Sequence, residues 1–124
     1  MLFRSAFPAQ RLVIAFQPHR YTRTRDCLAD FAQVLARADA LALTEVYAAG
    51  EAPIPGADGK ALAQAVREQV GAPAALVYEP SIEALPSSLS ALLKDGDVLV
   101  TLGAGSIGGL PGRLKQTMNE ELRA

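Results

Sequence analysis

Short apolar runs alternate along this chain with longer segments in which apolar residues recur every three or four positions. The short runs are bounded by Gly, Pro or charged residues and lack in–out alternation, which is typical of strands covered on both faces. We therefore predict strands at Arg11–Phe16, Ala40–Val46, Ala74–Tyr78 and Asp97–Leu102.

The segments between these runs predict helices. We place them at Thr24–Ala38, Lys60–Val70, Ser81–Leu93 and, near the end of the chain, about residues 112–122. In the first two, helical spacing predicts buried stripes that consist of Leu28, Phe31, Val34 and Leu35, and of Leu62, Ala63, Val66 and Val70.

Polar residues and one proline suggest where these helices begin. Thr22 or Thr24 is the expected N-cap of the first helix, and Asp58 that of the second. Pro86 interrupts the third segment, so its better helix is Ser87–Leu93.

Alternation of strands and helices at this spacing predicts βαβ units and an α/β fold. A chain of 124 residues is expected to form a single domain, here Rossmann-like, with a mostly parallel sheet and helices on both faces. In such sheets ligands bind at the carboxyl ends of the strands. Three segments fall there: the His19–Arg23 turn, Glu45–Glu51 and the Gly103–Gly108 loop.

Composition narrows the class of protein. Twelve basic against thirteen acidic residues argue against a nucleic-acid binder, which needs a basic excess. No run approaches the roughly 20 apolar residues of a membrane span, and Met1–Phe7 does not have the pattern of a secretory signal. With Cys27 as the single cysteine, we expect a soluble, cytoplasmic protein with no membrane partner.

The segment Phe16–Arg25 carries the clearest chemistry. It groups His19, Arg20 and Arg23 between a strand and a helix, where guanidinium groups suit a carboxylate or phosphate. Arg20 and Arg23 are spaced to converge on one anion if the chain turns into a helix there, whereas Arg25 is expected on the helix surface. His19 is a candidate to orient substrate or move a proton, and a packing role is its alternative. A lone histidine excludes a metal site built from several histidines.

The loop Glu45–Asp58 contains two prolines and two glycines that favour an ordered, extended conformation. Tyr47 and Glu51 within it are candidate contacts to substrate or to a neighbouring domain. A packed structural loop is the alternative reading.

Two other functions are kept as alternatives. Gly103–Gly108 matches the glycine pattern of a NAD(P)-binding oxidoreductase domain, but it follows the last predicted strand and does not open a βαβ unit. A non-catalytic α/β module of the receiver type needs acidic residues after the first and third strands, where Gln17-Pro18-His19 and Glu79-Pro80 stand. The chain also lacks the G-x-x-x-x-G-K-[ST] phosphate loop.

Three segments, Phe16–Arg25, Glu45–Asp58 and Gly103–Gly108, together resemble the C-terminal domain of the Mur ligases of peptidoglycan synthesis, in that family's order. The resemblance covers about residues 11–114 and favours the alanine-adding members, with a Mur ligase for a different amino acid as the alternative.

The resemblance implies a part of an enzyme that joins L-alanine to UDP-N-acetylmuramate through an acyl phosphate, with ATP and Mg²⁺ bound mainly by two other domains of the protein. It implies that His19, Arg20 and Arg23 are catalytic, with the arginines holding the alanine carboxylate or neutralising the acyl phosphate. It also implies roles in cell-wall synthesis, cell shape and cell division.

One departure from the family concerns the start of the domain. In the family, an Asp-Tyr-Gly-His-His-Pro segment at the start of this domain helps to bind ATP, and no such segment precedes Arg11. We therefore expect residues 1–124 to be a C-terminal domain truncated at its N-terminal boundary and inactive alone.

Overall fold

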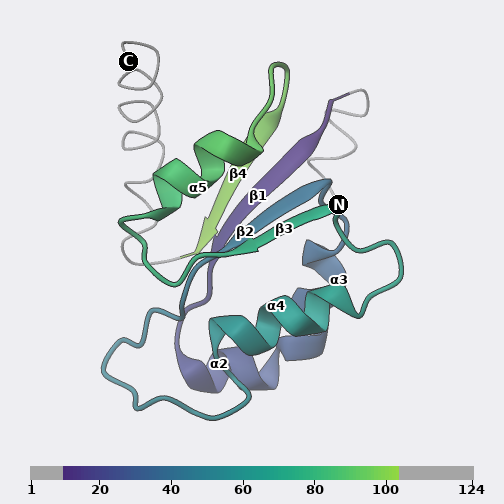
Figure 1. Ribbon diagram of the computed structural model, residues 1–124. Coiled ribbons are helices and arrows are strands. Elements are labelled where there is room, and N and C mark those ends of the chain that lie inside the picture. The colour runs from purple at the N-terminus through teal and green to yellow at the C-terminus, as the bar shows by residue number, and fades with distance from the viewer. Residues whose placement is uncertain (1–9, 104–124) are drawn as a thin grey trace.

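The computed structural model describes residues 10–103, which form one sheet between two layers of helices (Figure 1). α5 covers one face, and α2, α3 and α4 lie on the other. The elements are β1 Leu12–Gln17, α2 Tyr21–Asp26, α3 Leu28–Leu35, β2 Ala40–Leu43, α4 Gly59–Arg67, β3 Ala75–Tyr78, α5 Leu85–Leu92 and β4 Val98–Gly103. The predicted α/β, Rossmann-like fold is confirmed. The helix predicted at 112–122 lies outside the described residues.

The strand order is β3-β2-β1-β4, and every neighbouring pair is parallel. From β1 the chain moves outward to β2 and β3, and then returns through α5 to the other side of β1. Because parallel crossovers are right-handed, this reversal of direction carries α5 to the opposite face. The carboxyl ends of β1 and β4 therefore form the switch point at which such sheets bind ligands.

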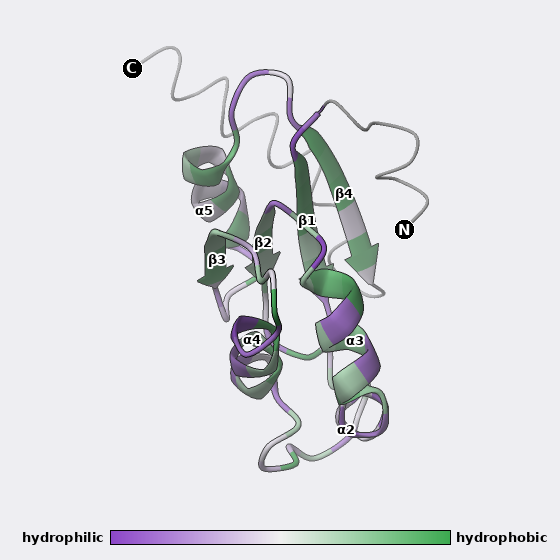
Figure 2. Ribbon diagram, turned by 90° about the vertical axis from the view of Figure 1, so that its right-hand side faces the viewer, coloured by the Kyte–Doolittle hydropathy of each residue, from purple (hydrophilic) through white to green (hydrophobic). Residues whose placement is uncertain are grey.

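Both faces of the two central strands are buried, which explains their unbroken apolar sequence. Larger side chains, such as Ile14 and Leu41, pack against α3 and α4, where Leu62 is fully buried. Alanines dominate the other face, where Leu85 and Leu89 of α5 cover them. Figure 2 shows the same division, with strongly hydrophobic strands between helices that are hydrophobic only in part.

The first predicted helix is two helices, α2 and α3, separated at Cys27 with φ −109° and ψ 12°. The N-caps expected for this first helix, Thr22 and Thr24, are wrong. Arg20 precedes α2, while Thr24 lies inside it and donates its hydroxyl hydrogen to the Arg20 carbonyl oxygen at 2.8 Å. Val34 is also wrong as a core residue, with 43% exposure, because the buried stripe of α3 runs through Phe31, Ala32 and Leu35 and leaves position 34 beside it.

The second predicted helix begins as expected. The Asp58 side chain accepts the Ala61 amide at 2.8 Å, which confirms the N-cap. α4 ends at Arg67, so Val70 lies beyond it and is fully exposed, contrary to its predicted place in the core. Pro86 does not interrupt the third helix. It sits in the first turn of α5, where its missing amide leaves no helical hydrogen bond unmade.

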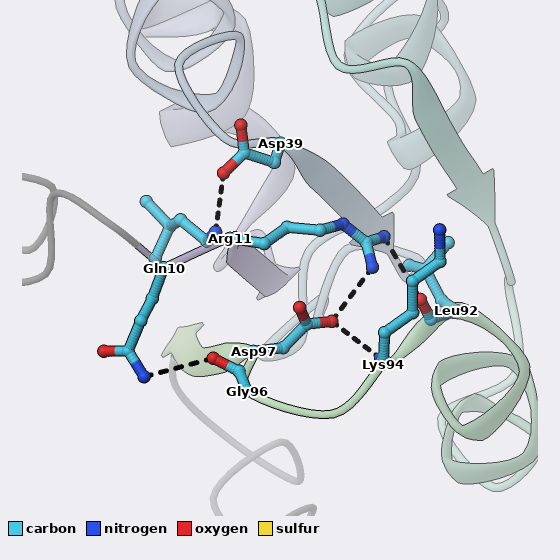
Figure 3. A network of polar contacts seen from close by, with 8 residues as sticks. Gln10, Arg11, Asp39, Leu92, Lys94, Gly96 and Asp97 are labelled. Atoms are coloured by element: carbon cyan, nitrogen blue, oxygen red, sulfur yellow. Dashed lines mark hydrogen bonds and ion pairs between the residues drawn. The ribbon is translucent and has the colours of Figure 1, made fainter.

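Side chains tie the amino edge of the sheet together, as Figure 3 shows. The Arg11 guanidinium binds the Asp97 carboxylate at 3.0 Å and the Leu92 carbonyl oxygen at 3.2 Å. The same Asp97 oxygen accepts the Lys94 amide at 2.8 Å. These contacts join the start of β1 to the turn between α5 and β4. Within residues 10–103, no helix has the length and apolar character that a bilayer span requires.

Candidate functional site

The carboxyl ends of the four strands meet at one edge of the sheet, where β1 and β4 are paired up to their last residues. Gln17 pairs with Gly103, whose φ is 134°. A Cβ atom on Gly103 would lie 2.4 Å from the Gln17 carbonyl oxygen, so any side chain would force the strands apart. Glycine at this position therefore lets β1 and β4 stay paired at their carboxyl ends.

The loops that follow β1 and β2 are paired beyond the strands. β2 ends at Leu43, short of the predicted Val46, and pairing resumes as an isolated parallel bridge between His19 and Tyr47. The Tyr47 amide donates to the Pro18 carbonyl oxygen, and the Arg20 amide donates to the Tyr47 carbonyl oxygen, both at 2.8 Å. The His19 and Tyr47 rings stack at a centroid distance of 5.7 Å and an angle of 11°.

This pairing holds Arg20 in an unusual backbone conformation. Its φ of 68° and ψ of 142° lie outside the regions that a non-glycine residue normally occupies. Its amide is fixed by Tyr47, and its carbonyl oxygen accepts both the amide and the hydroxyl hydrogen of Thr24. Such a conformation costs roughly 1–3 kcal/mol and persists where neighbours over-determine it, often at functional sites.

His19 and Arg23 line a cavity of about 230 Å³ at the switch point. Its other lining residues are Phe16, Gln17, Phe31 and Gly103. Phe16 and Phe31 meet edge to face, with centroids 5.3 Å apart. A guanidinium beside an aromatic wall suits a small anion that carries an apolar group. Arg20 is exposed and does not line this cavity, so its convergence with Arg23 on one anion stays a prediction.

Arg20 and Arg23 differ from Arg25 in the contacts of their guanidinium groups. Within residues 10–103, neither the Arg20 nor the Arg23 guanidinium has a hydrogen bond or an ion pair. Arg25, on the same helix, pairs with Asp26 at 3.0 Å, and its side chain is 56% exposed. This confirms the prediction that Arg25 belongs to the helix surface.

The two residues predicted to contact substrate occupy different environments. Tyr47 is 42% exposed and presents its stacked ring at the rim. Glu51 instead accepts the Thr22 amide at 3.1 Å and the Thr22 hydroxyl hydrogen at 2.7 Å. Those hydrogen bonds, with a smaller contribution from the charge of Arg20, hold the pKa of the Glu51 carboxyl below its ordinary value. Glu51 thus serves α2 as an N-terminal cap supplied by a distant loop.

Sequence reasoning missed Glu45 as an organising residue of this edge. Its carboxylate accepts the amides of Val46 at 2.7 Å and Gly59 at 2.8 Å, and the Tyr78 hydroxyl hydrogen at 2.6 Å. Burial, followed by this carboxylate, raises the pKa of Tyr78. The contacts fasten both ends of the loop to β3. The sequence showed a glutamate near the end of a predicted strand, but it did not show that the partner of this glutamate lies 33 positions away.

A search against protein families matches residues 2–105 to the model described as "Mur ligase, glutamate ligase domain". The chain belongs to the Mur ligase family. The match includes β1 to β4 and the two paired loops, so the site described above lies within the family's domain.

Individual proteins similar to this Mur ligase domain support the same family assignment. The chain is 59% identical over 113 residues to the UDP-N-acetylmuramate–L-alanine ligase of Paraburkholderia phytofirmans, which is 91% of this chain and 24% of that protein. It is 55% identical over 118 residues to the ligase of the same name from Burkholderia mallei, which is 95% of this chain and 25% of that protein. The chain spans about a quarter of the length of these curated relatives.

Membership in the Mur ligase family gives no support to the dinucleotide-binding alternative. Of its Gly103–Gly108 loop, only Gly103 is among the described residues, where it serves the approach of β4 to β1. In the described part of this domain, no three His, Cys, Asp or Glu side chains are grouped to hold a metal ion.

Proposed function

We propose that this chain is the C-terminal, amino-acid-side domain of a ligase that joins L-alanine to UDP-N-acetylmuramate in peptidoglycan synthesis. The names of its relatives support this substrate pair. The observation that carries the proposal is the Arg23 guanidinium, which lines the cavity at the switch point and has no hydrogen bond or ion pair within residues 10–103, with the exposed Arg20 three positions before it.

The reaction forms an amide from a carboxylate and an amine. ATP, with Mg²⁺, supplies the phosphoryl group that activates the sugar carboxylate, and both are bound mainly by parts of the protein outside this chain. The alanine nitrogen then attacks the activated carbonyl carbon. A C–N bond forms, the C–O bond to the phosphoryl group breaks, phosphate leaves, and the nitrogen loses a proton.

The residues of this domain contribute position and charge. Arg23, on the wall of the cavity, and the exposed Arg20, three positions before it, would hold the alanine carboxylate or neutralise the phosphoryl group as it leaves. Loss of one such donor raises the barrier by about 2.7–4 kcal/mol. His19, with its ring fixed against Tyr47, would orient the substrate.

The test uses the full-length protein that carries this chain, with Arg20→Ala and Arg23→Ala made separately. Phosphate release is measured with ATP, UDP-N-acetylmuramate and L-alanine. We expect turnover to fall at least about 100-fold in each variant. Arg25→Ala is the matched control, because Arg25 lies on the same helix and is exposed, and it should keep wild-type turnover. Normal turnover in both test variants would remove these arginines from the active site.

The isolated chain provides a second check. We expect residues 1–124 alone to have no ligase activity, since they span about a quarter of the relatives' length. L-Alanine-dependent phosphate release from the isolated chain would contradict this expectation. A cytoplasmic location and a role in cell division stay predictions, to be checked by fractionation and by depletion of the protein in cells.

A further inference from the structure

Residues of the Ala48–Glu51 turn reach across to the start of α2. The turn is tight, with φ of 50° at Ala49 and 89° at Gly50, and the Glu51 amide donates to the Ala48 carbonyl oxygen at 3.0 Å. This geometry directs the Glu51 carboxylate to Thr22, where each of its two oxygens accepts one hydrogen bond.

Thr22 lies between the two arginines of the proposed site. α2 has only six residues and no side-chain cap from its own N-cap residue, Arg20. A short helix without such a cap has unsatisfied amides at its start and frays readily. Glu51 supplies the missing cap from 29 positions away, at a residue that lies between Arg20 and Arg23 in the chain.

The two hydrogen bonds to Thr22 also orient the Glu51 carboxylate. Both oxygens are committed to Thr22, at 3.1 and 2.7 Å, and Arg20 lies near enough for its charge to stabilise the carboxylate. A glutamate that accepts hydrogen bonds from one residue through both oxygens holds protein groups in place.

We propose that Glu51 is a positioning residue of this ligase: by capping α2 through Thr22 it helps to fix Arg20 and Arg23 in their working directions. This inference rests on the proposed function for its catalytic consequence, but its structural part stands on the contacts alone.

A double-mutant cycle in the full-length protein tests the catalytic consequence. Thr22→Val keeps the shape of Thr22 and removes its hydroxyl, and Glu51→Ala removes the whole cap. We expect kcat/KM to fall about fivefold in the first variant and about twentyfold in the second. In the Glu51→Ala background, Thr22→Val should have no further effect, because the partner of the hydroxyl is already gone.

The division between kcat and KM separates positioning from substrate binding. Misdirected arginines should lower kcat more than they raise the KM for L-alanine. If Glu51 binds the amino acid, Glu51→Ala should instead raise the KM for L-alanine, Thr22→Val should have no effect, and the effects of the two substitutions should add. Any of these results would overturn the proposal. The exposed Glu83 provides a control, since Glu83→Ala should leave both constants unchanged.

Hydrogen exchange on the 124-residue chain tests the structural part without any assay of activity. Glu51→Ala should speed exchange of the Thr24 amide in α2 and of the Cys27 amide that closes it, and leave that of Leu62 in α4 unchanged. Unchanged exchange in α2 would disprove the positioning role. If the wild-type protein makes no L-alanine product at all, the proposed function fails, while the exchange result still decides whether Glu51 holds α2.

Discussion

At the amino edge of the sheet Arg11 and Asp97 neutralise each other, whereas at the carboxyl edge Arg20 and Arg23 have no ion pair within residues 10–103. The Arg11 and Asp97 side chains are only 25% and 5% exposed, and each makes a further hydrogen bond to the backbone (Figure 3). Arg20 and Arg23 are both exposed.

The difference separates charges that stabilise the fold from charges kept available for a ligand. An arginine that is already paired gains little from an incoming carboxylate, because a protein contact must be broken first. An unpaired arginine beside a cavity, as Arg23 is, retains its full interaction for the ligand. Substitutions at the amino edge should therefore change stability, and those at the carboxyl edge should change chemistry.

The largest expected effect on stability is at the amino edge. Asp97→Ala removes the partner of a partly buried guanidinium and the acceptor of the Lys94 amide, so we expect the free energy of unfolding to fall by about 2–3 kcal/mol. Urea denaturation of the chain measures it. The comparison variant is Asp26→Ala, which breaks an exposed pair and should cost about 0.5 kcal/mol or less. Equal losses in the two variants would contradict the distinction between buried and exposed pairs.

A smaller change is expected at the carboxyl edge. Arg23→Ala removes an exposed charge with no hydrogen bond or ion pair within residues 10–103, so the free energy of unfolding should stay within about 0.5 kcal/mol of wild type. The same urea titration measures it. A marked loss of stability would show that Arg23 supports the fold, and a fall in turnover could then no longer be assigned to the chemistry.

The smallest effect concerns Glu51 and acid. Hydrogen bonds from Thr22 lower the pKa of this carboxyl from its ordinary 4.5, so its stabilising contribution is present above that pH and is lost as the pH falls through the lowered value. The melting temperatures of wild type and Glu51→Gln should differ slightly at pH 7 and converge as the pH falls below the lowered pKa of this carboxyl. A constant difference from pH 7 to pH 3 would show that the ionised carboxylate is not what Thr22 recognises.

Much of the fold was predictable because its signals are local. Strands buried on both faces are unbroken apolar runs, and Asp58 caps the helix that directly follows it. The break at Cys27 escaped prediction because no proline or glycine marks it. Thr22 and Thr24 have the right residue type for a cap, but the cap came from Glu51 in another loop.

The candidate site was predictable in part, for the same reason. The turn with His19, Arg20 and Arg23 was visible as a cluster after a strand, and its place at the carboxyl edge followed from the alternation of elements. Its supports were not visible, since Glu45 and Glu51 act on partners tens of positions away. A sequence pattern shows which groups can react more readily than which groups hold them.

The bridge between His19 and Tyr47 also constrains how this domain can vary in length. Phe16 and Leu43 are the last residues at which β1 and β2 pair. The bridge lies three positions further along in the loop after β1, at His19, and four positions further along in the loop after β2, at Tyr47. Deleting or inserting one residue in either loop would slide the stacked rings out of register and release the backbone of Arg20. In homologous domains that keep this bridge, an insertion or deletion in one of the two loops should therefore be accompanied by a matching change in the other. When loops are exchanged between such domains, both should be exchanged together.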